Sequence, residues 1–337
     1  MIRRIATEEA FSIPEIATEL GRVVERGGDS ADLLLVKSIY DPATTDTQRG
    51  SLLPRLLDLD NRIDEMDRFG VDVALMMLTA PGVQMFDPDT AVGLAALAND
   101  QLADACRRHP GRYAPMGSFA PQRPGDAADE MTRCVDALGF NGFVVNSHTD
   151  GEYLDDPKYA PILAAAESLG RPLYIHPRSP SDGMAAAMRD FGMDGASWGY
   201  GIEMGTHLVR LMLSGTFDRF PGLKVVVGHM GEAVHFWLWR IDYMNGLAQR
   251  AGRAPKLELT PTEYFLRNVA ITTSGVEDPL ALRYSIDKIG VERVMWAIDY
   301  PYQPTEPAVR FIDEAPLTDD ERQLVAGGNA ARIFGIA

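Results

Sequence analysis

The chain has 337 residues, of which 46% are hydrophobic and 24% charged, and its formal net charge is -16 at pH 7. These proportions are typical of a globular protein with a sizeable core, and they exclude a disordered chain. The acidic balance argues against nucleic acid and against an anionic membrane as partners, because both need a basic surface. An anionic small molecule would have to be held by local arginines.

Cysteine content and the N-terminus bear on the cellular compartment. Cys106 and Cys134 are the only cysteines, too few for a disulfide framework or a thiolate metal site. The opening segment MIRRIATEEAF carries acidic residues where a secretory signal would be apolar. No window approaches the roughly 18 apolar residues that a membrane span needs. We therefore expect a cytoplasmic protein that does not bind membranes.

Short apolar runs, rich in β-branched and aromatic residues, alternate with longer helical patterns along the whole chain. The predicted strands are residues 3–7, 71–78, 113–119, 142–146, 172–176, 224–229, 268–274 and 293–299. The helical patterns that follow begin at Ala96, Asp126, Tyr159, Met204 and Glu321. The alternation predicts repeated strand–helix units.

Eight such units predict an α/β fold of the (β/α)8 TIM-barrel type, formed by a single domain over residues 1–337. A doubly wound sheet is the alternative, but no glycine-rich phosphate-binding pattern follows an early strand. Residues 13–54 and 178–201 break the rhythm. We interpret both as long loops over the C-terminal face of the barrel, where active sites of this fold lie.

Polar side chains stand at the predicted C-terminal ends of several strands. They are Glu8, Glu9, Thr79, Asn146, His148, His176, His229, Ser274 and Asp299. In a barrel these ends converge on one mouth, and carboxylates and imidazoles from separate strands are suitable ligands for a divalent metal.

Each candidate ligand also has a purely structural explanation. Asp299 could cap the next helix, and His176 could be a histidine of the core. Glu8 beside Glu9 could be a solvated pair. The recurrence of such residues at equivalent strand ends favours a metal site over these separate explanations.

Four segments, TEEAF, YIHP, GHMGE and AIDYPY, occur in this order. They resemble the decarboxylase branch of the amidohydrolase superfamily, which includes aminocarboxymuconate-semialdehyde, γ-resorcylate and, most similar of all, 5-carboxyvanillate decarboxylases. The resemblance covers nearly the whole chain. It implies non-oxidative decarboxylation of an ortho-hydroxylated aromatic acid, with 5-carboxyvanillate giving vanillate and CO2. The alternatives are γ-resorcylate or another hydroxybenzoate as substrate, or a mononuclear metal hydrolase of the same superfamily.

The resemblance also implies one catalytic Mn2+ held by Glu8, His176 and Asp299, with Zn2+ as the alternative. Hydrolases of the superfamily usually carry His-x-His on the first strand, but here Ala10 stands at the second position. The fourth strand offers Asn146 in place of a lysine that could bridge two metals. A binuclear hydrolase site is therefore not supported.

Further roles follow from the same resemblance. Asp299 would also be the proton donor, with Glu232 orienting His229 beside it. Arg240 and Tyr302 would contact the substrate.

Two other arginines are candidates for the substrate carboxylate, because the guanidinium fork suits bidentate contacts. Arg49 lies in the first long interruption, and Arg178 follows His176 as in the γ-resorcylate enzymes. The second match leaves the exact substrate open. The family resemblance further suggests a homodimer or homotetramer that acts on a small aromatic carboxylate.

Overall fold

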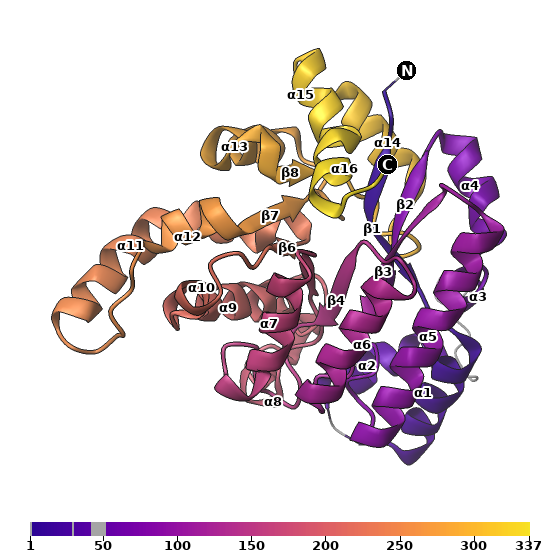
Figure 1. Cartoon of the computed structure of the whole chain (residues 1–337), viewed down its shortest axis with the longest axis horizontal. Helices are drawn as coiled ribbons and strands as arrows, with labels where there is room; N and C mark the ends of the chain where they lie inside the picture. The colour runs from indigo at the N-terminus through magenta and orange to yellow at the C-terminus, as the bar shows by residue number, and fades with distance from the viewer. Residues whose placement is uncertain (1, 29, 42–51) are drawn as a thin grey trace.

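The computed structural model describes residues 2–28, 30–41 and 52–337. Its eight parallel strands follow one another in sequence order around a barrel (Figure 1). They are β1 Ile5–Phe11, β2 Val73–Leu78, β3 Tyr113–Ser118, β4 Gly142–Asn146, β5 Leu173–His176, β6 Val225–Val227, β7 Val269–Thr272 and β8 Val294–Met295. The predicted barrel is confirmed.

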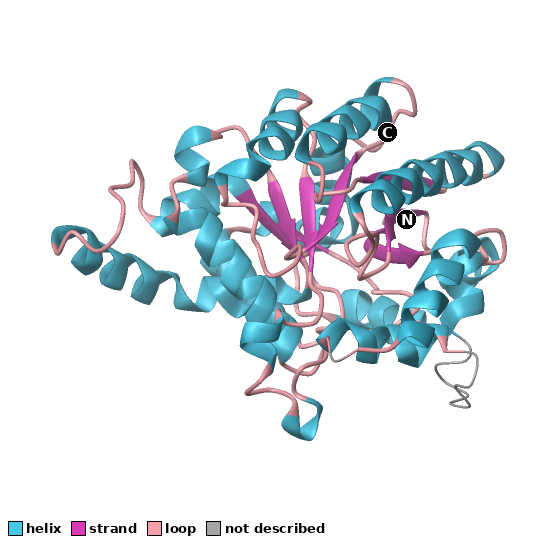
Figure 2. Cartoon of the chain, turned by 90° about the horizontal axis from the view of Figure 1, so that it is seen from below, coloured by secondary structure: helices cyan, strands magenta, loops and turns pink. Residues whose placement is uncertain are grey.

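Helices surround the strands, as Figure 2 shows from a second direction. The longer ones are α1 Pro14–Arg26, α2 Ala31–Tyr40, α4 Arg62–Phe69, α5 Pro88–Arg108, α6 Pro124–Asp136, α7 Ala160–Ser168, α9 Gly199–Leu213, α11 Val234–Arg250, α12 Pro261–Asn268, α13 Pro279–Ile289 and α14 Thr305–Glu314. The shorter ones are α3 Leu52–Leu57, α8 Asp182–Ala185, α10 Thr216–Arg219, α15 Asp319–Gln323 and α16 Asn329–Phe334. Several helices begin with proline, whose missing N–H is not needed in the first turn.

The strands are buried on both faces, since one face lines the barrel and the other meets the helices. The barrel interior is filled by Ile5, Val73, Leu75, Met77, Met116, Val144, Tyr174, Val226 and Met295. Ala330 and Phe334 of α16 belong to the same cluster. The interior is thus a packed core, which leaves the C-terminal mouth for the polar strand ends.

The first and last strands of the barrel have different bounds from those predicted. β1 continues to Phe11, so Glu8 and Glu9 lie within the strand, and its register against β2 shifts between Ala6 and Glu9. The eighth strand was predicted over residues 293–299, but regular pairing with β7 is limited to Val294–Met295. The next residues instead bond to β1, for example from Ala10 N to the Tyr300 carbonyl at 2.8 Å.

The first interruption, residues 13–54, is not simply a loop. Its described part forms α1, α2 and the start of α3, because apolar residues such as Ile16 and Leu20 recur at helical spacing and are buried. The second, residues 178–201, contains α8 and the first residues of α9. Each interruption connects a strand to the helices that follow it in the chain.

One helix pair departs from the compact outline. α11 and α12 extend side by side away from the barrel (Figure 1). α11 exposes a row of large apolar side chains, namely Phe236, Trp237, Trp239, Tyr243 and Met244. Within the described residues, no helix combines the length and apolar character required to cross a membrane.

Candidate active site

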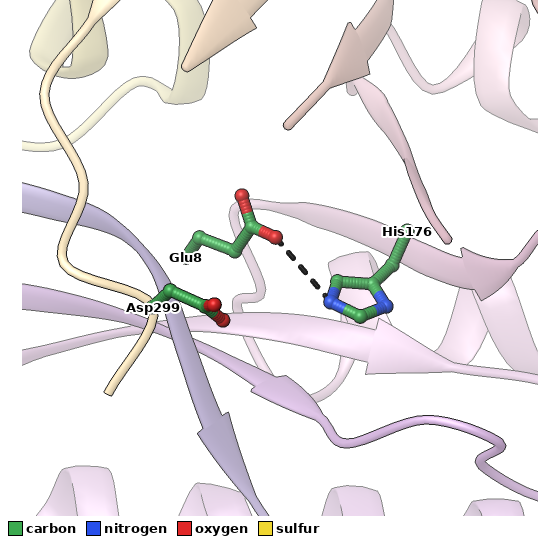
Figure 3. Close-up of side chains that lie close together, drawn as sticks. All are labelled: Glu8, His176 and Asp299. Carbon is green, nitrogen blue, oxygen red and sulfur yellow. Dashed lines mark ion pairs between the residues drawn. The ribbon is translucent and has the colours of Figure 1, made fainter. Parts of the chain in front are cut away.

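Glu8, His176 and Asp299 converge from β1, β5 and the segment after β8 (Figure 3). One ligand atom of each lies within 4.8 Å of the others. Glu8 Oε1 is 3.3 Å from His176 Nε2, and among the described residues this buried oxygen has no hydrogen-bond partner. A buried carboxylate oxygen without a donor is costly unless a cation meets it. The donor set therefore fits a divalent metal.

The ring of His176 is oriented for this role. Its Nδ1 lies 2.6 Å from the carbonyl oxygen of Pro177, so the Nδ1–H donates to the main chain. This tautomer leaves the Nε2 lone pair facing Glu8, as a metal-ligating histidine requires.

Glu8 is enclosed on its other side. The hydroxyls of Tyr174, Thr272 and Ser274 all donate to Oε2. A Cβ atom at Gly228 would lie 2.5 Å from the same oxygen. Only glycine leaves room for the carboxylate at this position.

His229 and Glu232 lie together because the chain after β6 makes a left-handed turn. Residues 229–233 all have positive φ, between 48° and 61°. Such a conformation costs roughly 1–2 kcal/mol for each residue other than glycine. It brings His229 Nδ1 to 2.8 Å from Glu232 Oε1, while His229 Nε2 lies 3.5 Å from Glu8 Oε1 and 4.0 Å from Asp299 Oδ2.

The cluster perturbs the acidity of its members. Burial acts to lower the pKa of His229, but the carboxylates of Glu8 and Glu232 outweigh it and raise the pKa to about 10. Burial and the Glu8 carboxylate raise the pKa of Asp299 above its usual range. Burial acts to raise the pKa of Glu8, but His229 and His176 bring it below normal. Asp299 is thus the carboxyl group of the triad that holds a proton most readily.

Two cavities meet at His229 and Asp299. One, of about 610 Å³, lies between α9, α11 and α13. The other, of about 530 Å³, is bounded by α2 residues such as Leu35 and Ile39 and by Tyr302. Among the described lining residues of both cavities there is no lysine or arginine.

The predicted substrate contacts have different outcomes. Tyr302 lines a cavity, with its hydroxyl 2.5 Å from Thr79 Oγ1. Arg178 is buried and does not line either cavity, because its guanidinium pairs with Asp32 of α2 and donates to the His148 carbonyl at 2.9 Å. In this structure Arg178 therefore makes a structural contact between α2 and the chain after β5.

Of the two remaining arginines, the structure describes Arg240 alone. Arg240 is exposed on α11, outside the lining of both cavities. Arg49 lies outside the described residues.

The structural explanations for the acidic residues fail. Glu8 and Glu9 are each 2% exposed, so they are not a solvated pair. Asp299 does not cap the next helix, since α14 begins at Thr305 after Pro304. Glu232 does not occupy the cap position of α11, which is Ala233.

Several residues around the site were not anticipated. Tyr174 and Thr272 could have been found from the strand period of two. Tyr174 shares a strand face with His176, and Thr272 stands two residues before Ser274. No local sequence pattern indicates that α2 forms a cavity wall. Nor does one indicate that Arg178 pairs with Asp32, since the two residues are 146 positions apart.

The barrel with a strand-end cluster of two carboxylates and a histidine defines a metal-dependent enzyme class. Residues 44–336 match the amidohydrolase family model, and the chain belongs to this family. It is 34% identical to γ-resorcylate decarboxylase of Rhodococcus jostii over 98% of both chains.

Solved structures give the same assignment. The chain is similar to 5-carboxyvanillate decarboxylase LigW of Sphingomonas paucimobilis, with 53% identity, complete coverage of both chains and a TM-score of 0.96. It is 41% identical to 5-carboxyvanillate decarboxylase of Novosphingobium aromaticivorans over 99% of this chain and 96% of the other, with a TM-score of 0.95. That structure contains manganese and 4-hydroxy-3-methoxy-5-nitrobenzoic acid. The resemblance to the decarboxylase branch is confirmed.

Proposed function

We propose that this protein is a Mn2+-dependent, non-oxidative decarboxylase that converts 5-carboxyvanillate to vanillate and CO2. The observation that carries the proposal is the triad of Glu8, His176 and Asp299. It occurs in a chain that matches a 5-carboxyvanillate decarboxylase over its full length. The decarboxylase relatives make a carbon–carbon lyase the reaction class.

Two carboxylates and one imidazole suit Mn2+, and Zn2+ is the alternative ion. Glu8 Oε1, His176 Nε2 and a carboxylate oxygen of Asp299 would hold it. When bound, the metal supplies Lewis-acid polarisation and a fixed point for the ionised oxygens of the substrate.

Asp299 supplies the proton in the reaction that we propose. The carboxyl proton moves to the ring carbon that bears the leaving carboxylate, and this carbon becomes tetrahedral while the ring loses aromaticity. The bond to the carboxylate carbon then breaks, its electron pair restores the aromatic ring, and CO2 leaves. The net change replaces one carboxylate of the substrate by one proton. Asp299 then takes up a new proton from solvent. His229, held by Glu232, lies close enough to assist this return.

The substrate carries a second carboxylate, which remains in the product. We assign its recognition to Arg49, together with the phenol of Tyr302 in the cavity beside α2. γ-Resorcylate has only one carboxylate, so an Arg49→Gln variant should lose more kcat/KM on 5-carboxyvanillate than on γ-resorcylate.

We further propose a homo-oligomer that buries the exposed face of α11. Contiguous exposed aromatic side chains typically mark an interaction surface. The rings of Trp239 and Tyr243 stack on this face with centroids 5.5 Å apart, and Arg240 lies between them in sequence. A contact between Arg240 and substrate would therefore have to form across this interface.

The proposed substrate is tested with purified metal-free protein reloaded with Mn2+ or Zn2+. Turnover of 5-carboxyvanillate and γ-resorcylate is followed by absorbance and by CO2 release. We expect a higher kcat/KM for 5-carboxyvanillate. Higher activity on γ-resorcylate would change the substrate, and ester hydrolysis without CO2 would overturn the decarboxylase assignment.

A further inference from the structure

Three hydroxyl groups converge on one oxygen of Glu8 inside the barrel. Thr272 Oγ1, at the end of β7, lies 3.0 Å from Glu8 Oε2, and the hydroxyls of Tyr174 and Ser274 donate to the same oxygen. All three residues have 0% exposure. The other carboxylate oxygen, Oε1, has no hydrogen-bond partner among the described residues.

The hydroxyls are themselves fixed in position. Thr272 Oγ1 lies 3.0 Å from both Tyr174 Oη and Ser274 Oγ. Ser274 Oγ also accepts the main-chain N–H of His229 at 2.9 Å. The donors are therefore placed by β5, β7 and the turn after β6, and not by Glu8 alone.

Rotation of the carboxylate would be costly in this setting. Turning the carboxylate part-way, so that both oxygens face the ligand atoms of His176 and Asp299, would weaken three hydrogen bonds between groups that are fully buried. The main chain at Gly228 packs against the same carboxylate so closely that a Cβ there would lie 2.5 Å from Oε2 and 2.9 Å from Oε1.

We propose that Tyr174, Thr272 and Ser274 form a hydroxyl cradle that makes Glu8 a one-oxygen ligand, presenting Oε1 alone to the metal. The inference rests on the proposed metal site. The three residues are positioning residues, because they act through Glu8 and do not reach the substrate cavities. Their effect should therefore be measurable as metal affinity without substrate.

Thr272→Val keeps the side-chain shape and removes one donor. We expect its dissociation constant for Mn2+ to rise about 10- to 100-fold, the usual effect of losing a partner of a metal ligand. Tyr174→Phe should shift affinity in the same direction. The matched control is Thr273→Val, whose residue is 1% exposed and whose hydroxyl accepts the Ala297 N–H at 3.1 Å instead of contacting Glu8.

The experiment titrates Mn2+ into metal-free wild-type and variant proteins and measures free Mn2+ by electron paramagnetic resonance. Thermal melting of each protein reports folding. Weakened binding in Thr272→Val and Tyr174→Phe, with wild-type affinity in Thr273→Val, supports the cradle. Should Thr272→Val fail to fold, Tyr174→Phe and Ser274→Ala carry the test.

Two results would overturn the inference while the proposed function stands. One is wild-type Mn2+ affinity in the cradle variants, and the other is an equal loss in Thr273→Val. A wild-type protein that binds no Mn2+ would instead refute the metal site itself, and the cradle with it.

Discussion

Asp299 combines two properties that a proton-donating ligand needs. It lies in the metal triad, and burial and the Glu8 carboxylate raise its pKa, so that it keeps a proton more readily than an exposed aspartate. Asp299→Asn retains the side-chain size but cannot deliver the carboxyl proton. We expect kcat for CO2 release to fall at least about 100-fold. Metal content is measured in parallel, and a variant with the wild-type rate would remove Asp299 as the donor.

The left-handed turn at residues 229–233 stores strain beside the site. Ala233 has φ of 56° and is exposed, so its methyl group gives little packing in return. Ala233→Gly should raise the free energy of unfolding by about 1 kcal/mol. Ala128→Gly, inside the regular helix α6, should lower it by about 1 kcal/mol. Urea denaturation of both variants checks the pair, and equal signs would contradict the strain argument.

The sequence could predict which residues meet, but not what each one does. Glu8, His176 and Asp299 stand at the mouth because parallel strands converge there. The ion pair of Arg178 could not be predicted, because its position two residues after His176 suggests the cavity, while its partner Asp32 lies far away in the chain. An ion pair between residues so far apart in the chain leaves no pattern in the local sequence.

At the scale of elements, helix α2 is a cavity wall held by one buried ion pair. Arg178→Met would leave the Asp32 carboxylate buried without its partner. We expect the free energy of unfolding to fall by about 3–5 kcal/mol. KM should rise as well, because Leu35 and Ile39 of α2 line the cavity.

A surface ion pair provides the control for this prediction. Arg123 pairs with Asp89, and the two side chains are 47% and 83% exposed, so Arg123→Met should change stability by no more than about 1 kcal/mol. Similar losses of unfolding free energy in the two variants would contradict the prediction that burial makes the Asp32 pair the more important one for stability.

Strand and helix periods predicted the barrel, since each strand is a short apolar run between turn signals. The register shift in β1 and the short pairing of β8 depend on how the first and last strands meet, and this contact lies outside any local window. The helices of the first interruption gave only a weak pattern, because glycines inside and directly after α1 are poor helix formers and offset the helical spacing of Ile16 and Leu20.

For the whole molecule, the buried charges predict a pH dependence of stability without metal. The Glu8 and Glu232 carboxylates overcome burial and raise the pKa of His229 to about 10, and burial raises that of Glu9 to about 8. The folded protein thus keeps protons that the unfolded chain loses, so stability must fall as pH rises above about 6.5. We expect a decrease on the order of 1–3 kcal/mol by pH 9.

Urea denaturation of the metal-free protein at pH 6.5 and pH 9 measures this dependence. His229→Gln should show a shallower decrease, because the histidine that holds the extra proton is absent. Wild-type stability that is constant or rises over this interval would show that the cluster does not retain its protons.

In the reaction that we propose, the strand-end cluster replaces an aromatic carboxylate by a proton. The most direct measurement is the reaction of Mn2+-loaded protein with 5-carboxyvanillate in D2O, with CO2, vanillate and ring deuterium quantified together. We expect one CO2 per vanillate and one deuterium at the carbon that lost the carboxylate. Substrate consumption without CO2, or vanillate without deuterium at that carbon, would contradict the claim.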